Sequence, residues 1–134
     1  MSDRLLRKVD AVTARVPDLE AGIAFYGGRL GHALKWRNES IGQAALALPE
    51  SDTEVVLTTQ HSYEPNWLVE SVERASRLIE EAGGHVVTAP FEIPVGRVAI
   101  AADPFGNVLV LVELSKGRYT TNDAGDVIAV EAEA

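Results

Sequence analysis

The sequence of 134 residues contains no cysteine. Disulfides, thiolate metal ligands and cysteine nucleophiles are therefore excluded. No apolar run approaches the roughly 20 residues that a membrane-spanning helix needs, and residues 1–8 lack the apolar centre of a secretory signal. These absences predict a soluble cytoplasmic protein with no membrane partner.

Clustered positive charge is also lacking. The net charge is −8, and the 12 lysines and arginines are scattered along the chain, whereas phosphate binding needs a basic stripe. We expect no nucleic-acid partner and a weak preference for cationic or neutral ligands. No His-Glu-x-x-His, Gly-x-Ser-x-Gly or phosphate-cradling glycine loop is present.

The length allows one sizeable core, because 46% of the residues are hydrophobic and 134 residues are too few for two ordinary globular domains. We therefore predict a single domain over residues 1–134. Periodicity divides it into a first module of about residues 8–60, a second of about residues 64–114, and a C-terminal tail of residues 115–134.

Each module is predicted to follow the order β-α-β-β-β. Asp18 and Ser71 are expected N-caps, and glycines end both helices, which we place over residues 18–30 and 71–82. In the first module the expected strands cover residues 8–16, 33–38, 41–48 and 53–60. In the second they cover residues 66–70, 85–88, 97–102 and a closing strand from residue 107.

The two modules align at a constant offset of 53 residues. Val16 then matches Val69, Asp18 matches Ser71, and the apolar run at residues 55–57 matches residues 108–110. Caps, apolar stripes and final strands all coincide, so we interpret the pattern as an internal duplication. One such unit would leave a face of its sheet uncovered, which favours pairing of the two.

The closing strand follows a turn, Asp103-Pro104-Phe105-Gly106-Asn107, and the two predict a β-hairpin. This stretch resembles the closing hairpin of the vicinal-oxygen-chelate family, which includes glyoxalases, extradiol dioxygenases and bleomycin-resistance proteins. The resemblance covers about residues 8–114. It implies an α+β fold in which two paired βαβββ modules form a curved mixed sheet around a cleft.

In metal-dependent members of that family, the first and last strands of each module supply the ligands. The usual glutamate after Asp-Pro-x-Gly-Asn falls on Val110, and the usual histidine of the first strand falls on Ala11. Carried through the repeat, the four positions are Ala11, Leu57, Glu64 and Val110. Three of these side chains have no donor atom, whereas a divalent site needs three or four ligands. We therefore expect no metal and no cofactor.

Strand alternation places a mainly apolar lining with a few polar groups on the face of Ala11 and Glu64, including Val55, as in many small-molecule sites. Trp67 should lie on the opposite face, toward the helices. The predicted ligand-binding residues are Glu64, Arg15, Thr13, Asn66, Thr59, Arg97 and Trp36. An ordinary core or surface role is the alternative for each.

The first functional hypothesis is a metal-free binding protein that sequesters a cationic or aromatic compound, similar to the bleomycin-resistance branch. The alternative is an enzyme: a lyase, isomerase or dioxygenase with atypical metal ligands, or a catalyst that uses Glu64 as its acid/base group. A third hypothesis is a protein that acts only through protein contacts. The resemblance also implies a homodimer, with an interface above about 1,000 Å².

The tail at residues 115–134 lies outside the resemblance. Its polar start and acidic end are typical of a partly disordered tail. The alternative is an added strand that covers a sheet edge or a partner subunit.

Overall fold

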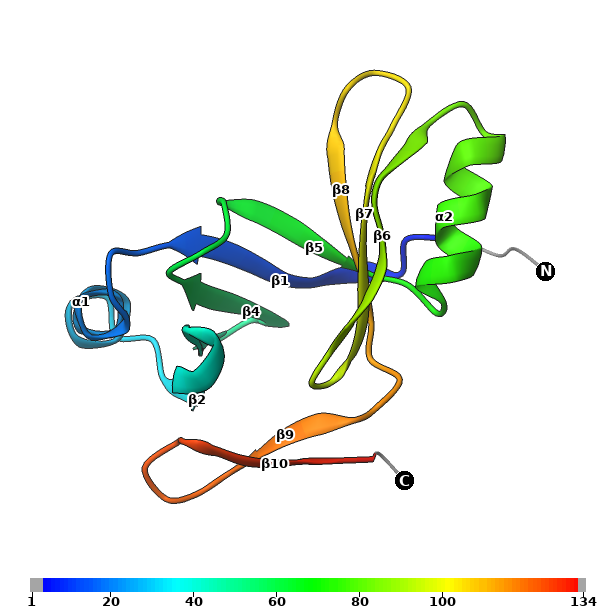
Figure 1. The fold of residues 1–134 in the computed structure, drawn as a ribbon. Helices are drawn as coiled ribbons and strands as arrows, with labels where there is room; N and C mark the ends of the chain where they lie inside the picture. Colours follow the sequence, from blue (N-terminus) through cyan, green and yellow to red (C-terminus); the bar gives the residue numbers. More distant parts are fainter. Residues whose placement is uncertain (1–3, 133–134) are drawn as a thin grey trace. The chain divides into compact units, whose positions relative to one another are not determined.

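The computed structural model describes residues 4–132, which form two compact units. The N-terminal unit comprises Asp10–Glu64 and Tyr119–Ala129. The C-terminal unit comprises Pro65–Arg118 together with residues 4–9 and 130–132. Each unit contains a four-stranded mixed sheet and helical structure on one face, so both are α+β (Figure 1).

The sheet of the N-terminal unit has the strand order β2-β3-β4-β1. β1 pairs in parallel with β4, while β3 pairs antiparallel with both β2 and β4. This arrangement is the predicted βαβββ module, closed by pairing its first strand with its last. The strands are β1 (Lys8–Arg15), β2 (Leu34–Asn38), β3 (Gln43–Leu48) and β4 (Ser51–Thr58).

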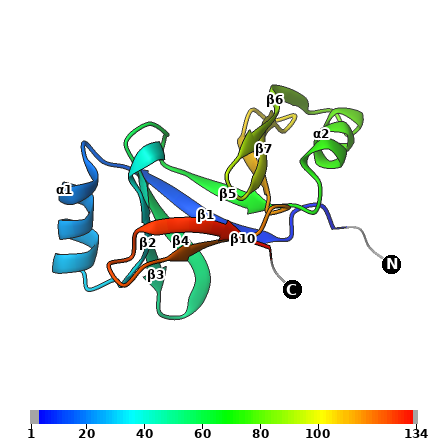
Figure 2. The same cartoon turned by 60° about the horizontal axis from the view of Figure 1, so that its bottom comes forward.

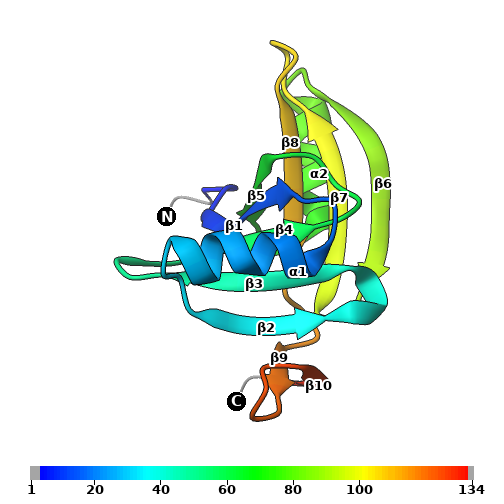
Figure 3. The same ribbon diagram turned by 90° about the vertical axis from the view of Figure 1, so that its left-hand side faces the viewer.

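The helical segment of this unit crosses one face of its sheet (Figure 3). It begins as α1 (Leu19–Ile23), and the side chain of Asp18 accepts a hydrogen bond of 2.8 Å from the backbone N–H of Ala21, as the N-cap prediction requires. It continues as a π-helical turn, η1 (Ala24–Arg29). Gly27 and Gly28 lie in that turn, and their low helix propensity accounts for the loosened winding.

The C-terminal unit repeats the plan with the strand order β5-β8-β7-β6. Its ten-residue helix, α2 (Val72–Glu81), lies beside β6 and β7 (Figure 1) and begins at Ser71, whose hydroxyl accepts from the N–H of Arg74. Trp67 packs in the cluster beneath α2, as predicted. The strands are β5 (Glu64–Leu68), β6 (His85–Ile93), β7 (Gly96–Ala102) and β8 (Val108–Glu113).

β6 is longer than the sequence analysis predicts. The predicted strand ends at residue 88, yet β6 continues to Ile93, with register shifts between Val86 and Thr88 and between Thr88 and Phe91; Pro90 lies within the second shift. A proline has no N–H to give to a neighbouring strand, and it is tolerated here because β6 is the last strand of its sheet.

The predicted turn between β7 and β8 is confirmed. The N–H of Asp103 donates to the carbonyl of Asn107 at 2.9 Å, and Gly106 adopts a φ of +95°. One carboxylate oxygen of Asp103 accepts from the N–H groups of Phe105 and Asn107, and the other accepts from the Asn107 side chain. The turn therefore depends on glycine for its backbone and on Asp103 for its hydrogen bonds.

Residues 115–132 contain a β-hairpin, which corrects the prediction of a partly disordered tail. The hairpin consists of β9 (Arg118–Thr121) and β10 (Val127–Glu131). Its loop lies against the edge of β2: the N–H of Arg37 donates to the carbonyl of Gly125 at 2.9 Å, and Arg37 forms a parallel bridge with Asp126 (Figure 2). The hairpin thus covers an edge, as the alternative prediction proposed.

The family fold predicted from the sequence, an α+β arrangement of two βαβββ modules, is confirmed. Within residues 4–132, no helix has the length and apolar character needed to cross a membrane.

Candidate functional site

The two faces of the N-terminal sheet differ in what covers them. Toward α1, Ala14, Ala44, Leu46 and Leu57 form a core cluster with residues of the helical segment. On the face turned away from α1, which we call the far face, lies a separate small cluster. Its members are Ala11, Ala45 and Val56, with Trp36 packed against them. Small side chains thus form the floor beside one large aromatic ring.

A β-bulge in β2 brings Trp36 to the far face. Leu34 pairs with Leu46, but Trp36 pairs with Ala45, so two steps on β2 correspond to one step on β3. Without this extra residue, Leu34 and Trp36 would share a face, because side chains alternate along a regular strand. Instead Leu34 packs toward α1 and Trp36 packs on the far face. Bulges commonly redirect side chains in this way near functional sites.

Glu54 is the charged centre of the far face. Trp36 Nε1 donates to its Oε1 at 3.2 Å, and Lys35 Nζ lies 3.0 Å from its Oε2. The side chain of Glu54 is 17% exposed, whereas that of Lys35 is 43% exposed. The bulge therefore directs two consecutive side chains of β2 to one carboxylate. The carboxylate is sheltered, and the lysine is partly exposed to solvent.

Tyr119, from the C-terminal hairpin, completes this group. Its ring centroid lies 4.7 Å from that of Trp36, with an interplanar angle of 57°. Burial raises the pKa of the Tyr119 phenol, a hydrogen bond with Asn38 opposes that shift, and the negative charge of Glu54 adds to it. The phenol therefore lies close enough to Glu54 for the carboxylate to disfavour a second negative charge.

The repeat changes register at the last strand of each module, and this corrects one predicted position. β1 pairs Ala14 with Leu57, whereas β5 pairs Trp67 with Leu111, so the offset is 53 residues in the first strands and 54 in the last. A shift of one residue moves a side chain to the other face. Leu57 belongs to the core beneath α1, and so does Val55 beside it, contrary to prediction. The structural counterpart of Val110 is Val56.

The corrected family positions are therefore Ala11, Val56, Glu64 and Val110. Only Glu64 carries an oxygen or nitrogen donor in its side chain, so these residues do not fit the divalent metal of the family's metal-dependent members. Within residues 4–132, no group of three or more histidine, aspartate or glutamate side chains is arranged to hold a metal ion.

Thr13 and Arg15, both predicted ligand-binding residues, lie in β1. The Thr13 hydroxyl is buried and donates to the carbonyl of Ser62 at 2.6 Å, with the carbonyl of Glu64 at 3.1 Å. Thr13 thus holds the connection that leads into β5 and positions the backbone of Glu64. Arg15 is the exposed last residue of β1.

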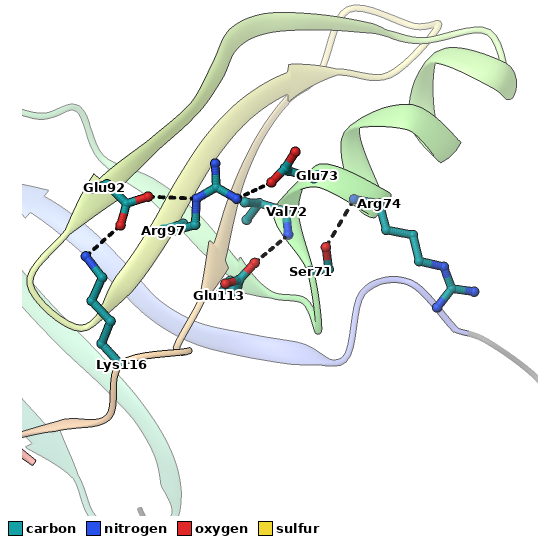
Figure 4. A network of polar contacts seen from close by, with 8 residues as sticks. All are labelled: Ser71, Val72, Glu73, Arg74, Glu92, Arg97, Glu113 and Lys116. Atoms are coloured by element: carbon teal, nitrogen blue, oxygen red, sulfur yellow. Dashed lines mark hydrogen bonds and ion pairs between the residues drawn. The ribbon is translucent and has the colours of Figure 1, made fainter. Parts of the chain in front are cut away.

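Arg97 lies elsewhere, in a network at the start of α2 (Figure 4). Its Nη1 is 2.5 Å from Glu73 Oε1 and its Nε is 3.0 Å from Glu92 Oε2. Hydrogen bonding to Glu73 is the main cause that raises the pKa of Arg97. Nearby, Glu113 accepts from the N–H of Val72 at 3.0 Å. Arg97 therefore connects β7 to α2 within the C-terminal unit.

Two predicted residues remain. Thr59 follows β4, where its N–H donates to the carbonyl of Gly42 at 3.2 Å. Asn66 lies in β5 of the C-terminal unit, opposite Val110 of β8. Of the predicted ligand-binding set, Trp36 is thus the member that joins the polar and aromatic group around Glu54.

Four residues of this group are not predicted from the sequence: Lys35, Asn38, Glu54 and Tyr119. Side chains alternate along β4, so Glu54 lies on the same face as Val56. Predicting that face required the register of β4 relative to β1. Lys35 required the bulge, and Tyr119 required the contact of the C-terminal hairpin with β2.

Comparison with known proteins identifies the family. Residues 8–111 match the model of the Glyoxalase/Bleomycin resistance protein/Dioxygenase superfamily. The chain belongs to this superfamily, which confirms the resemblance of its closing hairpin. No curated protein matches the sequence with significant similarity.

Solved structures share the fold at low sequence identity. Methylmalonyl-CoA epimerase from Mycobacterium tuberculosis is 21% identical with a TM-score of 0.66, over 84% of this chain and 91% of that chain. A hypothetical protein from Bacillus halodurans is 19% identical with a TM-score of 0.66, over 86% and 98%. A Streptomyces coelicolor methylmalonyl-CoA epimerase variant in complex with 2-nitronate-propionyl-CoA is 20% identical with a TM-score of 0.63, over 81% and 97%.

Proposed function

We propose that this protein is a metal-free small-molecule binding protein of the glyoxalase/bleomycin-resistance type. The observation that carries the proposal is the residue content of the four family positions. Ala11, Val56 and Val110 offer only aliphatic side chains where metal-dependent members have ligands, and Glu64 alone cannot hold a divalent ion. A binding role needs no metal.

The far face of the N-terminal unit supports this role. Small-molecule sites combine an apolar lining with a few polar groups that fix orientation. Here the lining is Ala11, Ala45 and Val56. The orienting groups are the Trp36 ring and the Glu54 carboxylate, which are already joined by a hydrogen bond of 3.2 Å. Their geometry is therefore set before a ligand arrives, which lowers the entropic cost of binding.

Metal analysis tests the proposal. The purified protein is stripped with a chelator, incubated separately with zinc, iron, manganese, cobalt and nickel, and desalted. We expect each metal to remain well below one equivalent and the thermal midpoint to stay unchanged. One equivalent of any of these metals, with a raised midpoint, would overturn the assignment of the four positions.

A second candidate is an isomerase that moves a proton through Glu64. The observation that favours it is that the single carboxylate among the four positions has its backbone held by the buried Thr13 hydroxyl. A carboxylate carried by an anchored backbone is a reasonable acid/base group. The solved epimerases with this fold suggest methylmalonyl-CoA as the first substrate to assay.

The assay for this candidate follows exchange of the substrate's α-proton with deuterated water. Exchange by the wild type that falls about 100-fold or more in Glu64→Gln would support catalysis, because that is a typical contribution of an acid/base group. Glu70→Gln is the control, since Glu70 is an exposed carboxylate that follows β5. Exchange that is absent, or unaffected by Glu64→Gln, would exclude this role for Glu64.

A further inference from the structure

The Glu54 carboxylate has a sheltered partner and a solvent-exposed partner. Trp36 Nε1 donates to one oxygen, and this donor is fixed by the packing of its ring on the far-face cluster. Lys35 Nζ contacts the other oxygen at 3.0 Å, with 43% of its side chain exposed. Exposed ion pairs contribute little to stability, because water and salt screen them and a flexible side chain must be ordered. The ammonium of Lys35 is therefore the readily exchanged member.

The surroundings of that ammonium suit a cation with an aromatic ring. The rings of Trp36 and Tyr119 lie 4.7 Å apart, and aromatic faces attract positive charge. Tyr119 also lies near enough to Glu54 for the carboxylate charge to contribute to the raised pKa of its phenol. The protein as a whole carries a net charge of −8, which also favours the approach of a cation.

We propose that Lys35 is a built-in substitute for the ammonium group of a ligand. The site then takes small primary amines that carry a planar aromatic ring: the ligand's ammonium replaces that of Lys35 on Glu54, and its ring contacts Trp36 and Tyr119. This inference rests on the proposed binding function and specifies the ligand class of the far face. The bulge in β2 contributes to this site, because it places both Trp36 Nε1 and the Lys35 ammonium beside the Glu54 carboxylate.

The test uses benzylamine, which is protonated at neutral pH, and benzyl alcohol as an uncharged probe of similar size. Dissociation constants are measured by NMR shift titration of the folded protein. We expect Lys35→Met to tighten benzylamine binding by about fivefold, the effect of removing an exposed competing ion pair, and to leave benzyl alcohol unchanged. Glu54→Gln should remove the preference for the amine.

Lys116→Met is the matched control. Lys116 is also 43% exposed and also pairs with a glutamate, at 2.6 Å from Glu92 Oε1, and its replacement changes the net charge by the same amount. It should not alter the affinity for either probe. An equal gain in both lysine variants would indicate a general charge effect and overturn the inference.

Three further outcomes would also overturn it. They are weaker benzylamine binding in Lys35→Met, an unchanged preference in Glu54→Gln, and shifts confined to residues outside the far face. If the probe binds elsewhere on the protein, the inference about Lys35 fails but the proposed small-molecule binding function stands. The proposal of a metal-free function fails only if a metal binds in the metal analysis. Circular dichroism melts of each variant confirm that the protein is folded in every titration.

Discussion

The edge strands β2 and β6 occupy equivalent positions in the two units, but they differ in what lies beside them. β2 and β6 each follow the helix of their module, and each lies at one end of its strand order. The edge of β2 contacts the C-terminal hairpin through Arg37 and Gly125. β6 pairs only with β7 among the strands of residues 4–132, and it carries Pro90 as well as the exposed side chains of Val87 and Phe91.

Some features occur in both units, and we call them the shared frame; others occur only near the candidate site. Caps, parallel closing strands and buried leucines occur in both units, since both need the same core. A register shift of the same kind lies in β6, between Val86 and Thr88, so the bulge at Lys35 also belongs to the shared frame. The covering hairpin lies at β2, where Trp36, Glu54 and Tyr119 meet. The N-terminal unit therefore carries the candidate site, while Pro90 at the edge of the C-terminal unit limits further strand pairing there.

The largest expected effect concerns the shared frame. Leu57 and Leu111 are both 0% exposed and are structural counterparts in β4 and β8. Leu57→Ala and Leu111→Ala should each lower the free energy of unfolding by about 2–5 kcal/mol, because each leaves a cavity in a helix-covered core. Urea denaturation measures both. A loss below about 1 kcal/mol in only one of them would show that the two cores are not equivalent.

The covered edge should respond to Gly125→Val. Gly125 has a φ of +89°, and an added Cβ would lie 3.0 Å from Leu34 Cδ2. A β-branched residue is strained in that conformation by about 1–3 kcal/mol, so the hairpin should loosen from β2. Hydrogen exchange of the Arg37 amide should then accelerate.

The amides of β6 provide the internal control, because β6 belongs to the C-terminal unit and the loop that contains Gly125 belongs to the N-terminal unit. Equal acceleration at Arg37 and throughout β6 would indicate global destabilisation instead of local release. Unchanged exchange at Arg37 would show that Gly125 does not hold the edge.

The smallest expected effect is a pH dependence at the turn of the C-terminal unit. The hydrogen bond from the Asn107 side chain is the main cause that lowers the pKa of Asp103, and backbone N–H groups add to it. A lowered pKa in the folded state means that the stabilisation is present above the unfolded pKa and is lost as the pH falls through the folded pKa. Asn107→Ala should raise the pKa of Asp103 toward its usual value, as measured by NMR titration. The same pKa in both proteins would refute the assigned cause.

The sequence alone was sufficient for much of the frame. Asp18 and Ser71 predict the helix starts because their side chains suit N-caps, and Asp103 to Asn107 predicts a turn because of proline and glycine chemistry. Faces were harder to predict. The second module has one extra residue between its first and last strands, which reverses the sheet face of each side chain in the last strand relative to a constant offset. A constant offset therefore gives Leu57 as the counterpart of Val110, whereas the structural counterpart is Val56.

The residues around Glu54 could not be predicted for a related reason. A bulge has no strong sequence signature, and the alternation rule fails at the position where it occurs. Tyr119 reaches Trp36 from a segment far along the chain, and no local pattern specifies that contact.

The cover of β2 also has a consequence for the order of events during synthesis. A ribosome makes Arg37 long before Gly125 and Asp126, so the β2 edge emerges without the segment that later pairs with it. Until the hairpin is translated, the nascent chain presents an unsatisfied strand edge beside the Trp36 ring. The N-terminal unit can therefore complete its edge only late in synthesis, and we expect chains truncated before Gly125 to self-associate more readily than the full chain.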